Sequence, residues 1–178
     1  MARRSLPWFV RRDVTTHTHA FFLSHVAEDA AEIADLKAAI EGYSGRGART
    51  SLRCFVDVQN WQIGNDNGTV IRDRLLHSDH MVCWVTPSYV ATTRGWVWME
   101  LAYAELIELS MNIAQFGLRA PFIVPVFYNV GIAQIERTPL LAYWQRQLAY
   151  TQQSPDIAEI ARKLVDFHEQ ELRKREGL

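Results

Sequence analysis

The sequence predicts one α/β domain of three layers, in which helices cover both faces of a parallel sheet of about five strands. Short apolar runs alternate with segments of helical periodicity along most of the chain, which is the pattern of successive β–α–β units. The length of 178 residues suits a single domain with its own core. The composition, 48% hydrophobic and 22% charged, is typical of a globular protein.

The first expected elements are two strands with a helix between them. Residues 15–25 alternate at first and then become continuously apolar, which predicts a strand that enters a two-sided core. Residues 27–41 place Ile33, Leu36 and Ile40 at helical spacing after an acidic first turn, which suits the positive end of a helix dipole. Residues 51–57 predict the second strand.

The middle of the chain begins with a polar loop over residues 58–68, whose glycines and asparagines favour turns. Residues 70–76 then predict a short amphipathic helix. Residues 80–86 predict a third strand, which Pro87 ends, and residues 101–112 predict the next helix.

The last part is less regular. Residues 120–127 predict a fourth strand, but Pro125 cannot donate a ladder hydrogen bond, so we expect a bulge or a position partly at a sheet edge. Residues 129–153 are ambiguous, and one interpretation is a short helix over about residues 140–148. The final helix is predicted with Ser154 as its N-cap and Pro155 at its first position, before a charged tail.

The charge balance and the N-terminus exclude several classes of protein. A net charge of −1 and a pI near 6.6 give no overall field toward nucleic acid or an anionic membrane, and we expect neither as a partner. No apolar run approaches the roughly 20 residues that a membrane span needs. Residues 1–16 are basic, but the apolar run of residues 6–10 is shorter than the about 7–15 residues of an export signal. We therefore expect a cytoplasmic protein with a basic leader over residues 1–16 and one domain over residues 17–178.

Two cysteines, Cys54 and Cys83, lie inside expected buried strands. A disulfide between them is one interpretation, and two reduced core thiols of a cytosolic protein are the favoured one. The chain has no Walker-type loop, no GxGxxG fingerprint and no zinc-binding spacing, so no bound cofactor or metal is expected.

Polar residues follow several of the expected strands. Ser24 and His25 end the first strand, Asp57 ends the second, and Thr86 and Ser88 lie at the end of the third. The segment that leads to Glu100 also begins at the end of that third strand. Because ligands of open parallel sheets bind outside the carboxyl ends of the strands, these residues are the candidates for a site.

Glu100 lies in an unusually apolar sequence, Trp96-Val97-Trp98-Met99-Glu100-Leu101. A carboxylate in such surroundings loses water, and its pKa tends to rise. Trp96 and Glu100 are four residues apart and share one face of a helix, whereas Trp96 and Trp98 diverge. An aromatic wall beside a desolvated carboxylate is typical of sites for sugar chemistry, although a surface carboxylate is the simpler reading of Glu100.

Four sequence boxes, in this order and spacing, resemble a Toll/interleukin-1 receptor (TIR) domain. Residues 21–29, Phe-Phe-Leu-Ser-His followed by an acidic pair, resemble the first box, and residues 54–64 resemble the second strand and the BB loop. Residues 77–89 resemble the third strand and the turn after it. Residues 96–101 resemble the Trp-x-x-x-Glu signature of TIR domains that consume NAD. The resemblance implies a single-domain, flavodoxin-like three-layer TIR fold.

The resemblance also implies an enzyme that breaks the bond between nicotinamide and ribose in NAD, with NAD as its substrate. Glu100 corresponds to the glutamate that engages the hydroxyls of this ribose, where a carboxylate stabilises oxocarbenium charge. Water would then give linear ADP-ribose, and an atom of the same molecule would give a cyclic isomer. The implied substrate-binding residues are Phe22, Ser24, His25, Asp57, Trp61, Gly64, Ser88, Tyr89 and Trp96.

Simpler readings stand beside several of these roles. Trp98 is expected to pack in the core, and His17 and His19 are expected to be polar residues of a strand and not a metal pair. For His25, a structural contact is as good an interpretation as contact with the substrate. For Asp57, a role as a helix or loop cap is as good an interpretation as substrate binding. For Trp61 there are two interpretations: its ring stacks on adenine, or it contacts another protein.

A TIR chain of this length resembles the bacterial defence type, as in the Thoeris antiphage system, in which a separate effector senses the nucleotide product. Self-association through the BB loop is a further expectation. A fragment of a longer protein and a secreted effector remain open. The two alternative functions are a non-catalytic TIR interaction module and an enzyme similar to nucleoside deoxyribosyltransferases, which share the three-layer fold.

Overall fold

A single parallel sheet organises the chain. The structure, a computed structural model, describes residues 18–43, 52–56, 67–92, 95–114, 121–131, 134, 150–152 and 156–176. The sheet has five strands in the order β2-β1-β3-β4-β5, and all of its pairings are parallel. The strands are β1 (His19–Ser24), β2 (Cys54–Val56), β3 (Ser78–Val85), β4 (Ile123–Tyr128) and β5 (Tyr150–Gln152).

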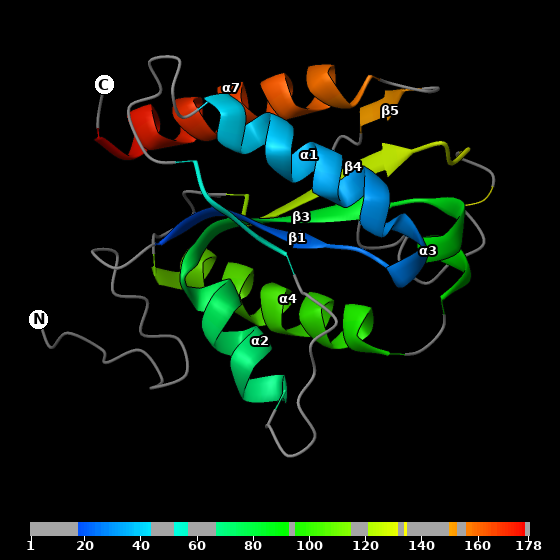
Figure 1. The fold of residues 1–178 in the computed structure, drawn as a ribbon. Helices are drawn as coiled ribbons and strands as arrows, with labels where there is room; N and C mark the ends of the chain where they lie inside the picture. Colours follow the sequence, from blue (N-terminus) through cyan, green and yellow to red (C-terminus); the bar gives the residue numbers. More distant parts are fainter. Residues whose placement is uncertain are drawn as a thin grey trace, which may run out of the picture.

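Helices connect the strands and cover both faces of the sheet (Figure 1). They are the 3-10 helix η3 (Ala27–Asp29), α1 (Ala30–Gly42), α2 (Asn67–Leu76), α3 (Pro87–Ala91), α4 (Trp96–Ala114) and α7 (Ile157–Glu176). Helices α1 and α7 lie side by side on one face, and α2 and α4 lie on the other (Figure 1). The expected α/β fold class, with helices on both faces of a parallel sheet, is confirmed.

Each face of the sheet carries its own apolar core. Between the sheet and helices α1 and α7, side chains such as Phe21, Trp84 and Leu36 are fully buried. Between the sheet and helices α2 and α4, the buried set includes Phe22 and Met81. Strand β3 lies in the middle and is buried along its whole length, as expected for a parallel strand with both faces covered.

The two cysteines lie in separate cores. Cys54 packs in the core beneath α1 and α7, whereas Cys83 packs in the core beneath α2 and α4, and both are free thiols. Strand β1 lies between the strands that carry them. The favoured interpretation of two reduced, buried thiols is therefore confirmed, and the disulfide interpretation is wrong, because the sheet separates the two sulfur atoms.

Pro125 lies inside the sheet, in register with Cys83 of β3. The carbonyl of Phe122 accepts from Met81 of β3, and alternation along the strand then turns the nitrogen of Pro125 toward the β5 side. Strand β5 pairs with β4 only from Val126 onward. No β5 residue among those that the structure describes is paired opposite the ring nitrogen. The expected bulge or position partly at an edge stays a prediction.

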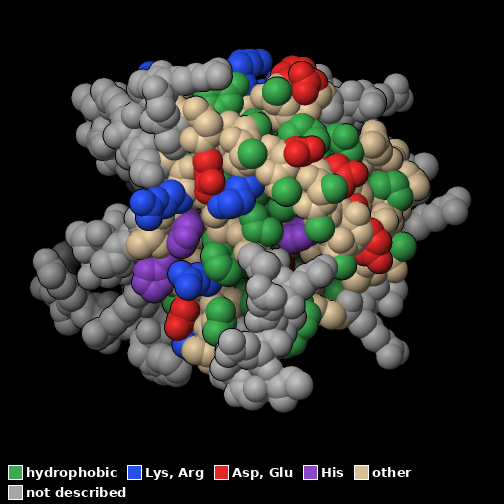
Figure 2. All heavy atoms as spheres, viewed as in Figure 1, with side chains coloured by type: hydrophobic (Ala, Val, Ile, Leu, Met, Phe, Trp, Pro, Cys, Tyr) green, Lys and Arg blue, Asp and Glu red, His purple; other side chains and the backbone are tan. Residues whose placement is uncertain are grey.

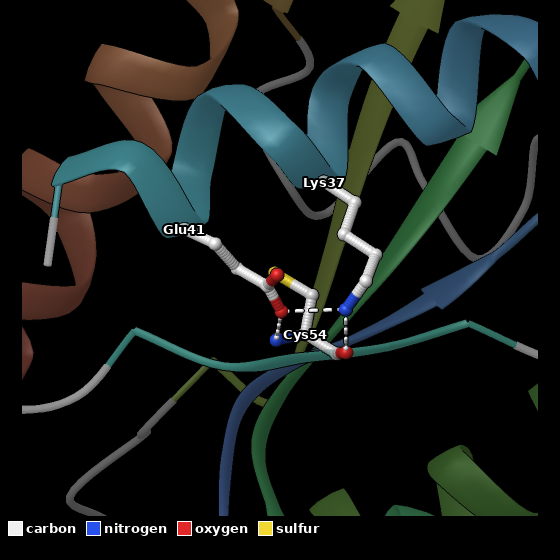
Figure 3. A network of polar contacts seen from close by, with 3 residues as sticks. All are labelled: Lys37, Glu41 and Cys54. Atoms are coloured by element: carbon white, nitrogen blue, oxygen red, sulfur yellow. Dashed lines mark hydrogen bonds and ion pairs between the residues drawn. The ribbon is translucent and has the colours of Figure 1, made fainter.

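Two side chains of α1 close the outer edge of β2 (Figure 3). Lys37 Nζ donates to the carbonyl of Cys54 at 2.7 Å, and the amide of Cys54 donates to Glu41 Oε1 at 2.9 Å. Lys37 and Glu41 also pair with each other at 2.5 Å. The adjacent carbonyl, of Arg53, points the other way and accepts from Ala20 of β1. The outward amide and carbonyl of Cys54, which an edge strand would otherwise leave unpaired, are thus satisfied by side chains.

Some expectations fall on residues that the structure does not describe. These are the leader over residues 1–16, the loop of residues 58–66, the short helix around residues 140–148, and the cap formed by Ser154 and Pro155. None of the helices in the described part of the chain has both the length and the apolar content that crossing a bilayer requires.

Candidate functional site

The candidate site lies at the carboxyl edge of the sheet, where β1 and β3 end and where α3 and α4 begin. Strand β1 ends at Ser24 and β3 ends at Val85, and the two strands pair in register with Ser24 beside Cys83. Helix α3 follows β3 directly, and the first turns of α4 lie on the same side of the molecule (Figure 1). This topology brings together side chains that are far apart in the sequence.

Ser24 and Glu100 are in direct contact at this edge. The Ser24 hydroxyl donates to Glu100 Oε2 at 2.5 Å, and the two residues are 76 positions apart. Ser24 has no exposed surface, and Glu100 is only 2% exposed. A buried carboxylate needs hydrogen-bond donors, and this serine supplies one of them.

Tyr89 completes a compact polar group with these two residues. It is 1% exposed and belongs to α3, and its phenol lies beside Ser24, Cys83 and Glu100. Burial raises the pKa of the Tyr89 phenol well above its ordinary value of 10.0, and the nearby acidic groups of Cys83 and Glu100 raise it further. The phenol is therefore neutral at physiological pH and is available as a hydrogen-bond donor.

The two tryptophans of α4 lie in different environments. Trp96 is 38% exposed at the first position of the helix. Trp98 packs against the core beneath α2 and α4, and its indole Nε1 donates to the carbonyl of Thr92 at 3.0 Å. The expected core position of Trp98 is confirmed, and Trp96 is the tryptophan with surface to offer a ligand.

The remaining predicted residues of β1 and α3 differ in burial. Phe22 is fully buried and its ring packs against Phe55 with centroids 5.3 Å apart. His25 is half-buried, and burial lowers the pKa of its imidazole, so the ring is neutral at pH 7. Ser88 is half-buried, and its carbonyl accepts from the amide of Thr92 at 3.1 Å. Their roles in binding stay predictions, and Asp57, Trp61 and Gly64 lie outside the described residues.

A second buried pair lies at the same edge: sequence reasoning placed Thr86 there and Asp29 in the first box, but it did not predict that the two residues are in contact. The Thr86 hydroxyl donates to Asp29 Oδ2 at 2.7 Å, and the two residues are 57 positions apart. Both are almost fully buried. Burial raises the pKa of the Asp29 carboxyl above its ordinary value of 3.8, and the nearby Glu32 and Glu28 add to this, while the Thr86 hydroxyl acts against it. The available signal was the position of each residue just after a strand, at the edge where Ser24 lies.

Basic and histidine side chains gather at the opposite end of the strands (Figure 2). Burial lowers the pKa of His19, and Arg74, Lys37 and Arg53 lower it further, which places these charges near the start of β1. The His19 ring also packs edge-on against Phe55 at 5.8 Å. His17 lies outside the described residues, and the described part of the chain holds no group of three or more potential metal ligands.

Chemically, the carboxyl edge offers two buried carboxyl groups, Glu100 and Asp29, each held by a hydroxyl, together with one neutral phenol and one exposed indole. Such a carboxylate is suited to stabilising developing positive charge, because a low-dielectric environment strengthens the interaction. The indole supplies an apolar face on which a planar or sugar ring can pack.

Comparison with solved structures identifies likenesses of fold. A metazoan TIR-STING receptor from C. gigas, in complex with 2',3'-cGAMP, superposes with a TM-score of 0.57 at 15% identity over 86% of this chain. Another structure of a TIR-STING receptor from C. gigas gives 0.53 at 13% identity over 86% of this chain. The TIR domains of the activated Roq1 resistosome, which recognises the effector XopQ, give 0.46 at 17% identity over 86% of this chain and 83% of that one.

The chain spans 40% and 41% of the lengths of the two TIR-STING receptors. At these identities the two likenesses to TIR-STING receptors show the fold alone, which is that of a TIR domain. No family model matches the sequence, and no curated protein matches it.

Proposed function

We propose that this chain is a TIR-fold enzyme that cleaves NAD at the bond between nicotinamide and ribose. The observation that carries the proposal is the position of Glu100. Its carboxylate lies at the carboxyl edge of a parallel sheet, where such folds bind ligands, in contact with Ser24 and one turn beyond the exposed Trp96. The product is linear or cyclic ADP-ribose, which would serve as a signal to a separate effector in defence against phage.

The proposed chemistry needs little beyond these groups. Nicotinamide leaves NAD as a neutral molecule, so its departure requires no strong general acid. The ribose then acquires oxocarbenium character, and the Glu100 carboxylate stabilises this charge. Trp96 would pack against the same ribose and limit the access of water. Ser24 would hold the carboxylate in one orientation.

The burial of Glu100 sets a condition on this mechanism. Because the side chain is 2% exposed, contact with a ribose requires Glu100 to rotate or the Ser24 hydroxyl to exchange its partner. The ribose hydroxyls would then donate to the carboxylate in place of Ser24. Such an exchange conserves the number of hydrogen bonds, so its cost is that of the movement and not of an unpaired carboxylate.

The test is incubation of the purified protein with NAD at high protein concentration, with the products resolved by mass spectrometry. Glu100→Gln keeps the size of the side chain and an acceptor for Ser24 but removes the charge, and we expect turnover to fall by about 100-fold or more. Glu105→Gln, an exposed position of the same helix, is the matched control and should retain turnover. Absence of turnover in the wild type, also under crowding, would contradict the activity. Turnover that survives Glu100→Gln would contradict the site alone.

The second candidate is a non-catalytic TIR module that acts through protein contacts. The near-complete burial of Glu100 and its bond to Ser24 favour it, because a structural role explains both without a substrate. Calorimetric titration with NAD distinguishes the two, since a pure interaction module gives no binding heat. An assay of base exchange on deoxynucleosides in the same preparation tests the enzyme similar to deoxyribosyltransferases.

A further inference from the structure

Asp29 and Thr86 join two segments that frame the candidate site. Asp29 ends η3, just after β1, and Thr86 follows β3. The Thr86 hydroxyl donates to Asp29 Oδ2 at 2.7 Å, and the residues are 7% and 5% exposed. A buried hydrogen bond to a carboxyl group is stronger than one in water, so it ties the ends of the two strands firmly.

The same hydroxyl caps α3. Thr86 is the N-cap residue, and its Oγ1 accepts from the amide of Tyr89 at 3.1 Å. A hydroxyl has a single hydrogen, and here that hydrogen is given to Asp29. Asp29 thereby orients the hydroxyl so that a lone pair faces Tyr89. The start of α3, and with it the position of Tyr89, depends on both residues.

Tyr89 carries this constraint to Glu100. Its phenol is 1% exposed and lies beside Ser24 and Glu100, and Ser24 donates to Glu100 Oε2 at 2.5 Å. A series of contacts therefore runs from η3 to α4, through the two hydrogen bonds of Thr86, the position of the Tyr89 side chain beside Ser24, and the hydrogen bond from Ser24 to Glu100. A shift of α3 would move the phenol against Ser24, which donates to the Glu100 carboxylate.

We infer that Asp29 and Thr86 are positioning residues, which set the orientation of the Glu100 carboxylate through Tyr89 and Ser24 without touching a substrate. The inference about catalysis rests on the proposed function, whereas the inference about the orientation of Glu100 does not. A misplacement of about 1 Å at a reacting group costs about 100-fold in rate. Loss of the hydrogen bond between Thr86 and Asp29 should therefore lower kcat, while KM changes little.

The experiment compares Thr86→Val with Thr86→Ser. Valine keeps the shape of threonine and replaces its hydroxyl by a methyl group, whereas serine keeps the hydroxyl and lacks only the methyl group. The kinetic readout is nicotinamide release from NAD, and we expect Thr86→Val to lower kcat by about 10- to 100-fold and Thr86→Ser to stay near the wild type. The second readout is the carboxyl carbon resonance of Glu100 in protein labelled at glutamate, assigned by its absence in Glu100→Gln. We expect it to shift in Thr86→Val and not in Thr86→Ser.

A second pair keeps the test decisive where Thr86→Val does not fold. Asp29→Asn retains an oxygen that accepts from Thr86, whereas Asp29→Ala does not, so only Asp29→Ala should shift the Glu100 resonance. A resonance that moves in neither Thr86→Val nor Asp29→Ala overturns the inference and leaves the pair a purely structural tie. If the wild type releases no nicotinamide, the proposed function fails, and the resonance still decides whether Glu100 is positioned by this pair.

Discussion

The hydroxyl of Ser24 and the carboxylate of Glu100 are joined by a buried hydrogen bond of 2.5 Å across 76 positions of the chain. The bond links the end of β1 to the second turn of α4, which lies on the face of the sheet opposite α1 and α7. It is the contact through which the fold determines where the carboxylate lies.

Removal of the Ser24 hydroxyl should destabilise the fold. Ser24→Ala leaves an oxygen of a buried carboxylate without one donor, and we expect a loss of about 1–3 kcal/mol in the free energy of unfolding. Urea denaturation of Ser24→Ala, Glu100→Ala and the double variant measures the coupling between the two side chains. Additive effects in this cycle would show that the two groups do not interact in solution.

The closed edge of β2 makes a prediction about association. The double variant Lys37→Ala/Glu41→Ala frees the amide and the carbonyl of Cys54, and we expect concentration-dependent association through the exposed strand, measured by light scattering. The matched control is Arg162→Ala/Asp166→Ala, which removes an exposed pair with the same spacing from α7. Equal association of both double variants would mean that lost surface charge, and not the freed strand edge, is the cause.

Glu41 should also contribute to acid sensitivity. Burial acts to raise the pKa of its carboxyl, but the Cys54 amide and the Lys37 ammonium outweigh this effect and hold the pKa below its ordinary value of 4.5. The stability that Glu41 contributes is thus present above pH 4.5 and is lost as the pH falls through the lower pKa of the folded state. Glu41→Gln should flatten the loss of stability in this acidic range, as measured by urea denaturation at a series of pH values. An unchanged slope would contradict the lowered pKa.

Asp29 should have the opposite pH dependence. Its pKa is raised above 3.8, chiefly by burial, so the folded protein holds this proton more tightly than the unfolded chain. The corresponding stability is fully present below pH 3.8 and is lost as the pH rises through the folded pKa. Relative to Asp29→Asn, the wild type should therefore lose stability over this rise in pH. Asp35→Asn, at an exposed position of α1, reports the effect of removing a charge from the helix that directly follows Asp29.

Both thiols should be unreactive in the folded protein. Burial raises the pKa of Cys54 and of Cys83 to about 12, and the thiolate is the reactive form. At pH 8 we expect a thiol reagent such as DTNB to label neither cysteine in buffer and both in urea. Rapid labelling of the native protein would show that at least one strand opens readily.

Local patterns in the sequence were sufficient to predict most of the elements. Apolar runs predicted β1, β3 and β4, because a strand buried on both faces has to be apolar throughout, and helical spacing of Ile33, Leu36 and Ile40 predicted α1. Helix α3 and strand β5 were not predicted. The five residues of α3, which begin with Pro87, and the three residues of β5 carry too short a pattern to distinguish them from loops.

The sequence by itself determined that the fold is α/β and that Ser24 and the segment leading to Glu100 lie near the carboxyl ends of strands. That follows because burial on one or both faces of an element makes apolar residues recur along the chain with the spacing of a helix or a strand. Only the tertiary structure decided that β1 lies beside β3, that Ser24 donates to Glu100, and that Thr86 donates to Asp29. The two residues of each contact are 76 and 57 positions apart in the sequence, respectively for Ser24–Glu100 and Thr86–Asp29. Such contacts depend on strand order and on the direction of each side chain, and a local period specifies neither.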